Sequence, residues 1–176
     1  VANTATFVVE GRNDAPVFEA TDAETIVFVD SIESSSGLVF TGGFGWTSTN
    51  NTDPFGYPSV GSELHTNNSS ATYSGLAYLP FTGVDTPGTY TVYIDIGNYS
   101  NAPYANVANI GLRAGGTFMS PIESTTPVPA GGTKETWALT YEVTQADINA
   151  GIDFGLYVPT TGQNYNTSID NLVITQ

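Results

Sequence analysis

Strict alternation of apolar and polar residues is the feature that most constrains how this chain can fold. In residues 88–97 the side chains of Tyr90, Val92, Ile94 and Ile96 are spaced two apart, so they share one face of an extended strand. The same alternation recurs at residues 110–114, 137–143 and 152–158, and further strand-like runs lie at residues 25–30, 37–41, 71–81 and 168–175. Because each such strand buries one face, the sequence predicts an all-β fold: a two-sheet antiparallel β-sandwich, or jelly roll, with eight or nine strands.

One short segment, residues 144–151, is predicted to be helical. Thr144 is a suitable N-cap, Asp147 would lie in the first turn, and Gly151 would end the helix after one or two turns. Two longer segments, residues 42–68 and 117–133, fit no strand pattern, and we expect long loops there. Loops of that length in a compact sandwich commonly carry function.

An excess of acidic residues narrows the classes of partner. The 176-residue chain has 17 Asp and Glu against 3 Lys and Arg, which gives a formal net charge of −14. Such a surface repels phosphate backbones, so nucleic acid is not an expected partner. No run approaches the ~20 apolar residues of a membrane helix, so no membrane insertion is expected. Acids without basic partners favour divalent cations, and calcium is the predicted cofactor because it takes oxygen ligands.

Catalytic motifs are hard to find in this sequence. The chain has no cysteine, so disulfides and thiolate metal sites are excluded, and it has one histidine, His65. A Ser-His-Asp triad would have to use His65, but the stretch Ser62-Glu63-Leu64-His65 lacks the strand–turn–helix pattern of a nucleophile elbow. We therefore predict that the protein is not an enzyme.

Residues 11–17, with the sequence Gly-Arg-Asn-Asp-Ala-Pro-Val, lie between two strand-like runs. This stretch resembles the boundary between cadherin-like repeats in large bacterial adhesins of the RTX type, where the Asp, here Asp14, typically binds calcium. The resemblance implies that residues 1–23 are the last strand and linker of a preceding repeat, and that residues 24–176 form the ligand-binding sandwich. A plain proline-bearing turn is the alternative interpretation.

The second half of the chain resembles a different group of domains. Residues 88–98, 110–116, 137–141 and 168–174 together are similar to galactose-binding-like jelly rolls, which include many carbohydrate-binding modules. The stretch Asp30-Ser31-Ile32-Glu33 is similar to the opening of those modules, with Asp30 in place of the usual Asn. In that group an acidic residue of the first strand and the Asp of the last strand often share a structural calcium. The resemblance implies Glu33 and Asp170 as its ligands, with Asp30 beside them.

Strand parity suggests one binding face. Tyr93 and Asp95 fall opposite the core stripe of their strand, as do Arg113, Asp153 and Tyr157 on theirs. If these strands are neighbours, one sheet presents all five side chains together. Tyrosine offers a flat apolar surface for a sugar or proline ring, and Arg113 could grip a carboxylate with two hydrogen bonds. The alternative is a salt bridge of Arg113 with Asp95 or Asp153, flanked by tyrosines that merely favour β-strands.

The loops suggest a rival site. Residues 51–57, 98–104 and 163–166 each combine oxygen-bearing side chains with an aromatic residue. The predicted ligand-binding residues there are Tyr57, Tyr99, Tyr104, Asn164 and Tyr165, and the predicted polar or calcium-binding residues are Asp53 and Asn101. The alternative is that Asn and Pro form turns there and the tyrosines pack over loop backbone.

These observations predict a calcium-dependent recognition module of a secreted bacterial adhesin, at the cell surface. Its ligand would be a cell-surface glycan or an exposed C-terminal peptide on a host or neighbouring cell, bound by a monomer flanked by other adhesin domains. Two alternatives stay open. The domain could be a passive extender of the adhesin, or it could be a carbohydrate-binding module of a secreted polysaccharide-degrading enzyme.

Overall fold

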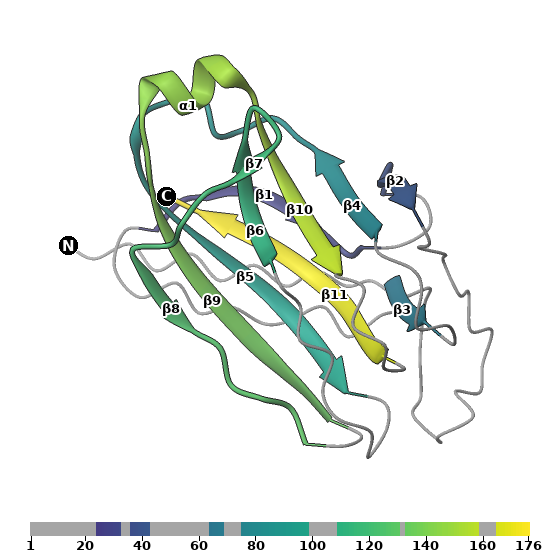
Figure 1. Cartoon of the computed structure of the whole chain (residues 1–176). Helices are drawn as coiled ribbons and strands as arrows, with labels where there is room; N and C mark the ends of the chain where they lie inside the picture. Colours follow the sequence, from purple (N-terminus) through teal and green to yellow (C-terminus); the bar gives the residue numbers. More distant parts are fainter. Residues whose placement is uncertain are drawn as a thin grey trace.

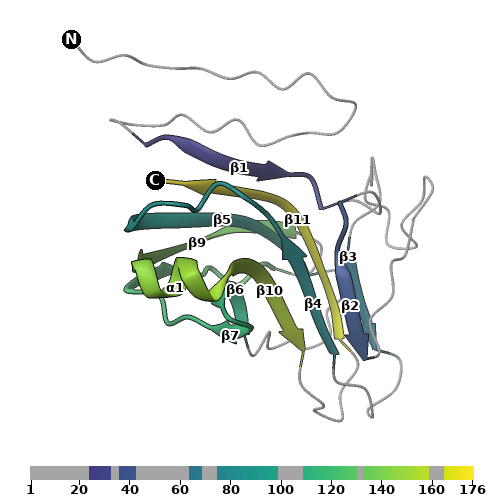
Figure 2. The ribbon, with the colours of Figure 1, turned by 90° about the horizontal axis from the view of Figure 1, so that it is seen from above.

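The computed structural model of the chain describes residues 24–32, 36–42, 64–68, 75–98, 109–130, 133–158 and 165–176. Within these ranges eleven strands form two facing antiparallel sheets, and the chain forms one short helix (Figures 1 and 2). The predicted fold class, a two-sheet antiparallel β-sandwich with a single short helix, is confirmed for this part of the chain. The boundary predicted at residue 23 falls outside it.

The sandwich has a six-stranded and a five-stranded sheet. In the six-stranded sheet the order is β1 (Ile26–Asp30), β11 (Tyr165–Thr175), β5 (Gly88–Asn98), β9 (Thr133–Val143) and β8 (Glu123–Thr125), with β3 (Leu64–Asn68) also paired to β11. In the five-stranded sheet the order is β2 (Val39–Gly42), β4 (Gly75–Pro80), β10 (Ile152–Val158), β6 (Asn109–Ala114) and β7 (Thr117–Phe118). From β4 onward most connections cross from one sheet to the other, so neighbours in the sequence face each other across the core.

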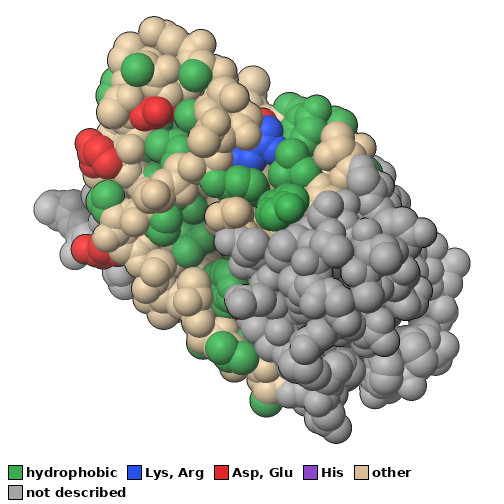
Figure 3. Space-filling view, in the orientation of Figure 1, with side chains coloured by type: hydrophobic (Ala, Val, Ile, Leu, Met, Phe, Trp, Pro, Cys, Tyr) green, Lys and Arg blue, Asp and Glu red, His purple; other side chains and the backbone are tan. Residues whose placement is uncertain are grey.

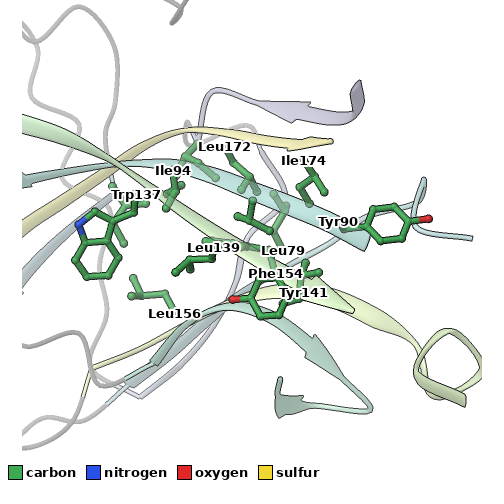
Figure 4. Packing of buried hydrophobic residues seen from close by; sticks show 14 of the residues in the cluster. Leu79, Tyr90, Ile94, Trp137, Leu139, Tyr141, Phe154, Leu156, Leu172 and Ile174 are labelled. Carbon is green, nitrogen blue, oxygen red and sulfur yellow. The ribbon is translucent and has the colours of Figure 1, made fainter. Parts of the chain in front are cut away.

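The core lies between the sheets and is built from the predicted stripes. Tyr90, Val92, Ile94 and Ile96 of β5 have no exposed surface, as the alternation requires. From β9 the stripe continues with the buried residues Trp137, Leu139, Tyr141 and Val143, and the facing sheet supplies Ala77, Leu79, Leu112, Phe154 and Leu156. Figure 4 shows side chains of both sheets meeting in this space. A side chain of this size contributes about 1.5–3 kcal/mol when it is fully buried, so the stripes stabilise the sandwich strongly.

A bulge in β11 explains why two core residues there are three positions apart. Ile169 and Leu172 are both fully buried, which strict alternation would not allow. The register between β11 and β5 shifts between Asp170 and Val173, and Asn171 has a positive φ of 47°. The extra residue resets the alternation, so Leu172 turns back to the core.

The helix α1 (Gln145–Ala150) lies at one end of the sandwich, where β9 crosses to β10 (Figure 1). Thr144 is its N-cap, Asp147 completes a capping box with it, and Gly151 ends it, as the sequence predicted. This helix, the only one within the described ranges, is too short to cross a membrane.

The prediction of strand-free loops at residues 42–68 and 117–133 was wrong. β3 lies in the first segment and β7 and β8 lie in the second. β3 has the polar sequence Leu-His-Thr-Asn-Asn, and its place is set by pairing with β11 rather than by an alternating pattern of its own. β7 and β8 have two and three residues, too few to display alternation.

One close approach between the sheets requires a glycine. Gly111 of β6 has a φ of +132°, and a Cβ there would overlap the hydroxyl of Tyr141 from the opposite sheet. Tyr141 is fully buried, and burial raises the pKa of its hydroxyl to about 12, although the backbone of Leu112 acts in the opposite direction. The Tyr141 side chain therefore packs directly against the backbone of Gly111 in the opposite sheet.

We predict that Gly111→Ala destabilises the domain far more than Gly151→Ala. Both positions have a positive φ, so both variants carry a backbone penalty of about 1–2 kcal/mol. A Cβ at residue 151 meets nothing within 4 Å, whereas one at residue 111 collides with Tyr141, which should add about 2–3 kcal/mol. Urea unfolding measures both. Adding Tyr141→Phe to Gly111→Ala should recover part of the loss, and equal costs for the two glycine variants would contradict this account.

Candidate functional site

The predicted five-residue face does not exist, because its members lie on two sheets. Tyr93 and Asp95 belong to β5 in the six-stranded sheet, whereas Arg113 of β6 and Asp153 and Tyr157 of β10 belong to the five-stranded sheet. The parity argument placed each side chain on the correct face of its own strand. The assumption that these strands are neighbours holds for β6 and β10, which pair directly, and was wrong for β5, which the crossovers place in the other sheet.

On the outer face of the six-stranded sheet, polar side chains form hydrogen bonds with one another. The hydroxyl of Tyr93 donates a hydrogen bond of 3.4 Å to Glu24 Oε2, and burial, followed by the Glu24 charge, raises the pKa of Tyr93. Asp95 accepts hydrogen bonds from Thr136 Oγ1 at 2.6 Å and from Asn171 Nδ2 at 3.0 Å. These contacts join β5 to β9 and β11, so Asp95 serves strand pairing here.

The predicted calcium ligands that fall in the described ranges have protein partners. Asp30 Oδ1 accepts hydrogen bonds from the backbone N–H of Ile32 at 2.6 Å and from the Ser36 hydroxyl. Asp170 Oδ2 lies 2.9 Å from Lys134 Nζ, in a pair that is partly exposed. Within the described residues no group of three or more acidic or histidine side chains is placed to hold a metal ion. Asp14, Glu33, Asp53 and Asn101 lie outside those residues, so the calcium site stays a prediction.

The outer face of the five-stranded sheet carries a buried ion pair. Arg113 and Asp153 are register partners on β6 and β10, with Nε 3.0 Å from Oδ1 and a hydrogen bond of 3.2 Å from Nη2 to Oδ2. Their side chains are only 6% and 18% exposed. Burial raises the pKa of Asp153, and the Arg113 charge acts in the opposite direction. The salt bridge considered as an alternative is thus present with Asp153, but it is buried rather than superficial.

Two aromatic rings enclose the guanidinium of this pair. Arg113 Cζ lies 5.0 Å from the ring centroid of Tyr78 and 5.7 Å from that of Phe118, distances at which cation–π attraction operates. Gly155 lies beneath, and a Cβ there would overlap Arg113 Cδ and come within 3.1 Å of the Phe118 ring. The missing side chain at residue 155 therefore lets Arg113 lie flat on the sheet. We call Tyr78, Arg113, Phe118 and Asp153 the arginine layer.

The arginine layer contains a donor without a partner. Arg113 Nη1 is buried, and no described residue accepts a hydrogen bond from it. Arg113 Nε is buried too, and it contacts Asp153 Oδ1 as an ion pair without forming a hydrogen bond. Asp153 Oδ1 is also buried, and apart from its ion pair with Arg113 Nε it makes no hydrogen bond to a described residue. Buried polar groups are nearly always satisfied in native proteins, so such an unused donor and acceptor side by side point to a ligand.

Apolar side chains surround the layer on the same face. Tyr157 and Leu76 are opposite each other in the register of β10 and β4, and both are half-buried. Val39 of β2 pairs with Tyr78 and is 38% exposed. Figure 3 shows a basic group set among hydrophobic side chains on this side of the molecule. A mostly apolar surface with a few convergent polar groups is typical of ligand-binding sites.

Two members of the layer were missed in the sequence. Tyr78 lies between Ala77 and Leu79, which are both buried in the core, so strand parity alone could have placed it on the outer face. Phe118 lies in a segment expected to be a loop, and no pattern in the sequence marks it.

The rival loop site falls almost entirely outside the described residues. This holds for Tyr57, Tyr99, Tyr104 and Asn164. Tyr165 begins β11, where its backbone pairs with Asn68 of β3. The loop site therefore stays a prediction.

Comparison with known proteins finds few relatives. No protein-family model matches the chain, and no curated protein matches it. Among solved structures, CBM35 from Paenibacillus barcinonensis aligns at 17% identity and a TM-score of 0.47, over 85% of this chain and 98% of the other. A family 35 carbohydrate binding module from Clostridium thermocellum aligns at 13% identity and a TM-score of 0.46, over 86% and 97%.

We predict strong energetic coupling between Arg113 and Asp153. Arg113→Met or Asp153→Ala alone leaves a buried charge without its partner, which should cost about 3 kcal/mol. The double variant removes both charges, so its cost should fall below the sum of the single costs by about 1 kcal/mol or more. Urea unfolding of all four proteins measures this coupling.

Lys134→Met and Asp170→Ala supply the matched control. That ion pair is more exposed, at 37% and 19%, so its coupling should stay below about 1 kcal/mol. Equal coupling energies in the two pairs would show that burial does not strengthen the interaction between Arg113 and Asp153.

Proposed function

We propose that this domain is a recognition module that binds a glycan on the outer face of its five-stranded sheet, over the arginine layer. One observation carries the proposal: a buried guanidinium, held between the rings of Tyr78 and Phe118, has an Nη1 donor that no described residue uses. A polar group this well fixed and left unsatisfied is costly unless a ligand completes its hydrogen bonds.

The surroundings of the donor suit a sugar ring. A sugar has an apolar C–H face and a rim of hydroxyls, and it needs flat apolar area together with a few oriented polar groups. Tyr157 and Tyr78 supply aromatic area on adjacent strands, and the Arg113–Asp153 pair supplies the polar groups. All of these residues stand on strands, which hold a site more rigidly than loops do.

The proposed role is binding rather than catalysis. Asp153 is the carboxylate of the arginine layer, and both of its oxygens engage Arg113. Hydrolysis of a glycosidic bond needs two carboxyl groups that face each other across the scissile bond, one of them free to transfer a proton. Asp153 is tied to Arg113 and so is poorly suited to either part.

We further propose that the module belongs to a secreted bacterial adhesin and is stabilised by calcium. Two features support this proposal: the chain has 17 acidic residues against 3 basic ones, and the stretch around Asp14 resembles a boundary between adhesin repeats. In that setting the module would attach the cell to glycans of a host or neighbouring cell. The passive extender is the alternative, and it requires that the arginine layer bind nothing.

We predict that Tyr78→Ala weakens glycan binding by about tenfold or more, because it removes an aromatic surface and uncovers Arg113. Tyr93→Ala is the matched control, since it removes a tyrosine from the outer face of the other sheet. Glycan arrays followed by calorimetry, with calcium and with a chelator, measure the effect on variants whose folding is unchanged. Loss in Tyr93→Ala but not in Tyr78→Ala would refute the proposed face.

A third variant tests the loops in the same assay. If Tyr104→Ala combined with Tyr165→Ala abolishes binding while Tyr78→Ala leaves it intact, the site lies in the loops. If no glycan binds in any condition, the passive extender is the better account.

We predict that calcium raises the thermal stability of the domain, whereas magnesium at the same concentration does so less. A ligand that binds only the folded state adds about 2.7 kcal/mol at a hundredfold excess over its dissociation constant. Scanning calorimetry in calcium, in magnesium and in a chelator measures the shift. Glu33→Gln should reduce the calcium effect, and Glu135→Gln, an exposed position on β9, should not. Equal melting temperatures in calcium and chelator would rule out structural calcium.

A further inference from the structure

We infer that the glycan held on this face is uncharged, and that the Arg113–Asp153 pair selects hydroxyl groups against carboxylates and sulfates. The inference rests on the proposed function, since it names the class of ligand for that same face. It also decides between the two ligand classes that the sequence left open, a glycan and a peptide carboxyl end, in favour of the glycan.

The charge of Arg113 is already compensated by Asp153. An arginine grips an anion best through two parallel N–H groups, and here Nε and Nη2 both face Asp153. A second carboxylate arriving at the layer would gain little from Arg113 and would be repelled by Asp153. Because Arg113 is buried and the Asp153 side chain is only 18% exposed, water would screen that repulsion less than at an open surface.

The hydrogen-bonding groups left over in the arginine layer suit a hydroxyl group better than an anion. Arg113 Nη1 is an unused donor, and Asp153 Oδ1 retains capacity to accept. A hydroxyl group both donates and accepts, so adjacent hydroxyls of a sugar can satisfy the two atoms together. A carboxylate or sulfate only accepts, so it would satisfy Nη1 and leave Oδ1 facing another negative oxygen.

The electrostatic field of the whole domain also disfavours anionic ligands. Of its three basic residues, Arg113 is paired with Asp153 and Lys134 with Asp170, against 17 acidic residues. A net charge of −14 lowers the local concentration of anionic ligands near the surface, whereas it leaves neutral glycans unaffected.

Access to the buried pair requires one side chain to give way. Phe118 stands on the two-residue strand β7 at the edge of the sheet, and its ring is half-buried. Among the described strands β7 pairs only with β6, so moving this ring breaks its contact with the Arg113 guanidinium and no pairing with a further strand. A sugar that displaces the Phe118 ring would take over its position against the Arg113 guanidinium.

The test compares neutral and acidic ligands on the wild-type domain. Glucan, xylan, mannan and galactan stand against polygalacturonate, alginate, sulfated galactan and a peptide with a free carboxyl end. We expect binding within the neutral set, abolished in Tyr78→Ala and changed less than about twofold between low and high salt. Binding of an acidic ligand that weakens with salt and is lost in Arg113→Met and Tyr78→Ala would overturn this inference yet keep the proposed face. Absence of any binding that depends on Tyr78 would overturn both.

Asp153→Asn provides a gain-of-binding test. It keeps the shape of the side chain and removes the negative charge, so Arg113 becomes available to anions. We expect acidic glycans to bind this variant at least about tenfold more tightly than the wild type. Asp95→Asn is the matched control, because it changes the net charge equally on the other sheet and should leave acidic glycans unbound. If the folded Asp153→Asn variant binds acidic glycans no more tightly than Asp95→Asn does, the inference is wrong. If Asp153→Asn does not fold, the wild-type comparison with its salt dependence decides.

Discussion

The contact between two apolar stripes across the sandwich is the constraint on which the rest of this structure depends. Each long strand has one face that must leave water, and the sheets satisfy this by placing those faces against each other. Ile94 and Leu139 of one sheet and Phe154 and Leu156 of the other thereby belong to one buried cluster between the sheets (Figure 4). Once the inner faces are committed, function on the strands is confined to the two outer faces, and these differ sharply in chemistry.

On the six-stranded sheet, the outer side chains Asp95 and Tyr93 are engaged by the fold itself. Asp95 joins β5 to β9 and β11 through Thr136 and Asn171, and Tyr93 binds Glu24, which lies just before β1. On the five-stranded sheet an ion pair lies under aromatic rings, with a donor and an acceptor left over. The difference in satisfaction, more than any difference in charge, distinguishes a surface that maintains the fold from one that can hold a ligand.

The sequence predicted most of the fold and little of the site, for reasons that individual residues make clear. Alternation identified the stripe from Tyr90 to Ile96, and the capping residues Thr144 and Gly151 identified the helix α1 between them. Both signals are local, so a single strand or helix turn contains all the information. Sheet order is not local, because it depends on where each connection crosses. Asp95 and Arg113 were therefore placed on one face, although they lie on different sheets. Phe118, on a two-residue strand, carried no pattern at all.

The core and the proposed binding face meet at one pair of glycines. Gly111 and Gly155 are register partners on β6 and β10. A Cβ at residue 111 would strike Tyr141 from the core side, and one at residue 155 would strike Arg113 from the outer side. At these two glycines only the backbone separates Tyr141 on the core side from Arg113 on the outer side. Because protein interiors are close-packed, the Tyr141 contact on the core side limits how far the backbone under Arg113 can move. An arginine held this way can present Nη1 in one fixed place, which is what selective recognition of a hydroxyl requires.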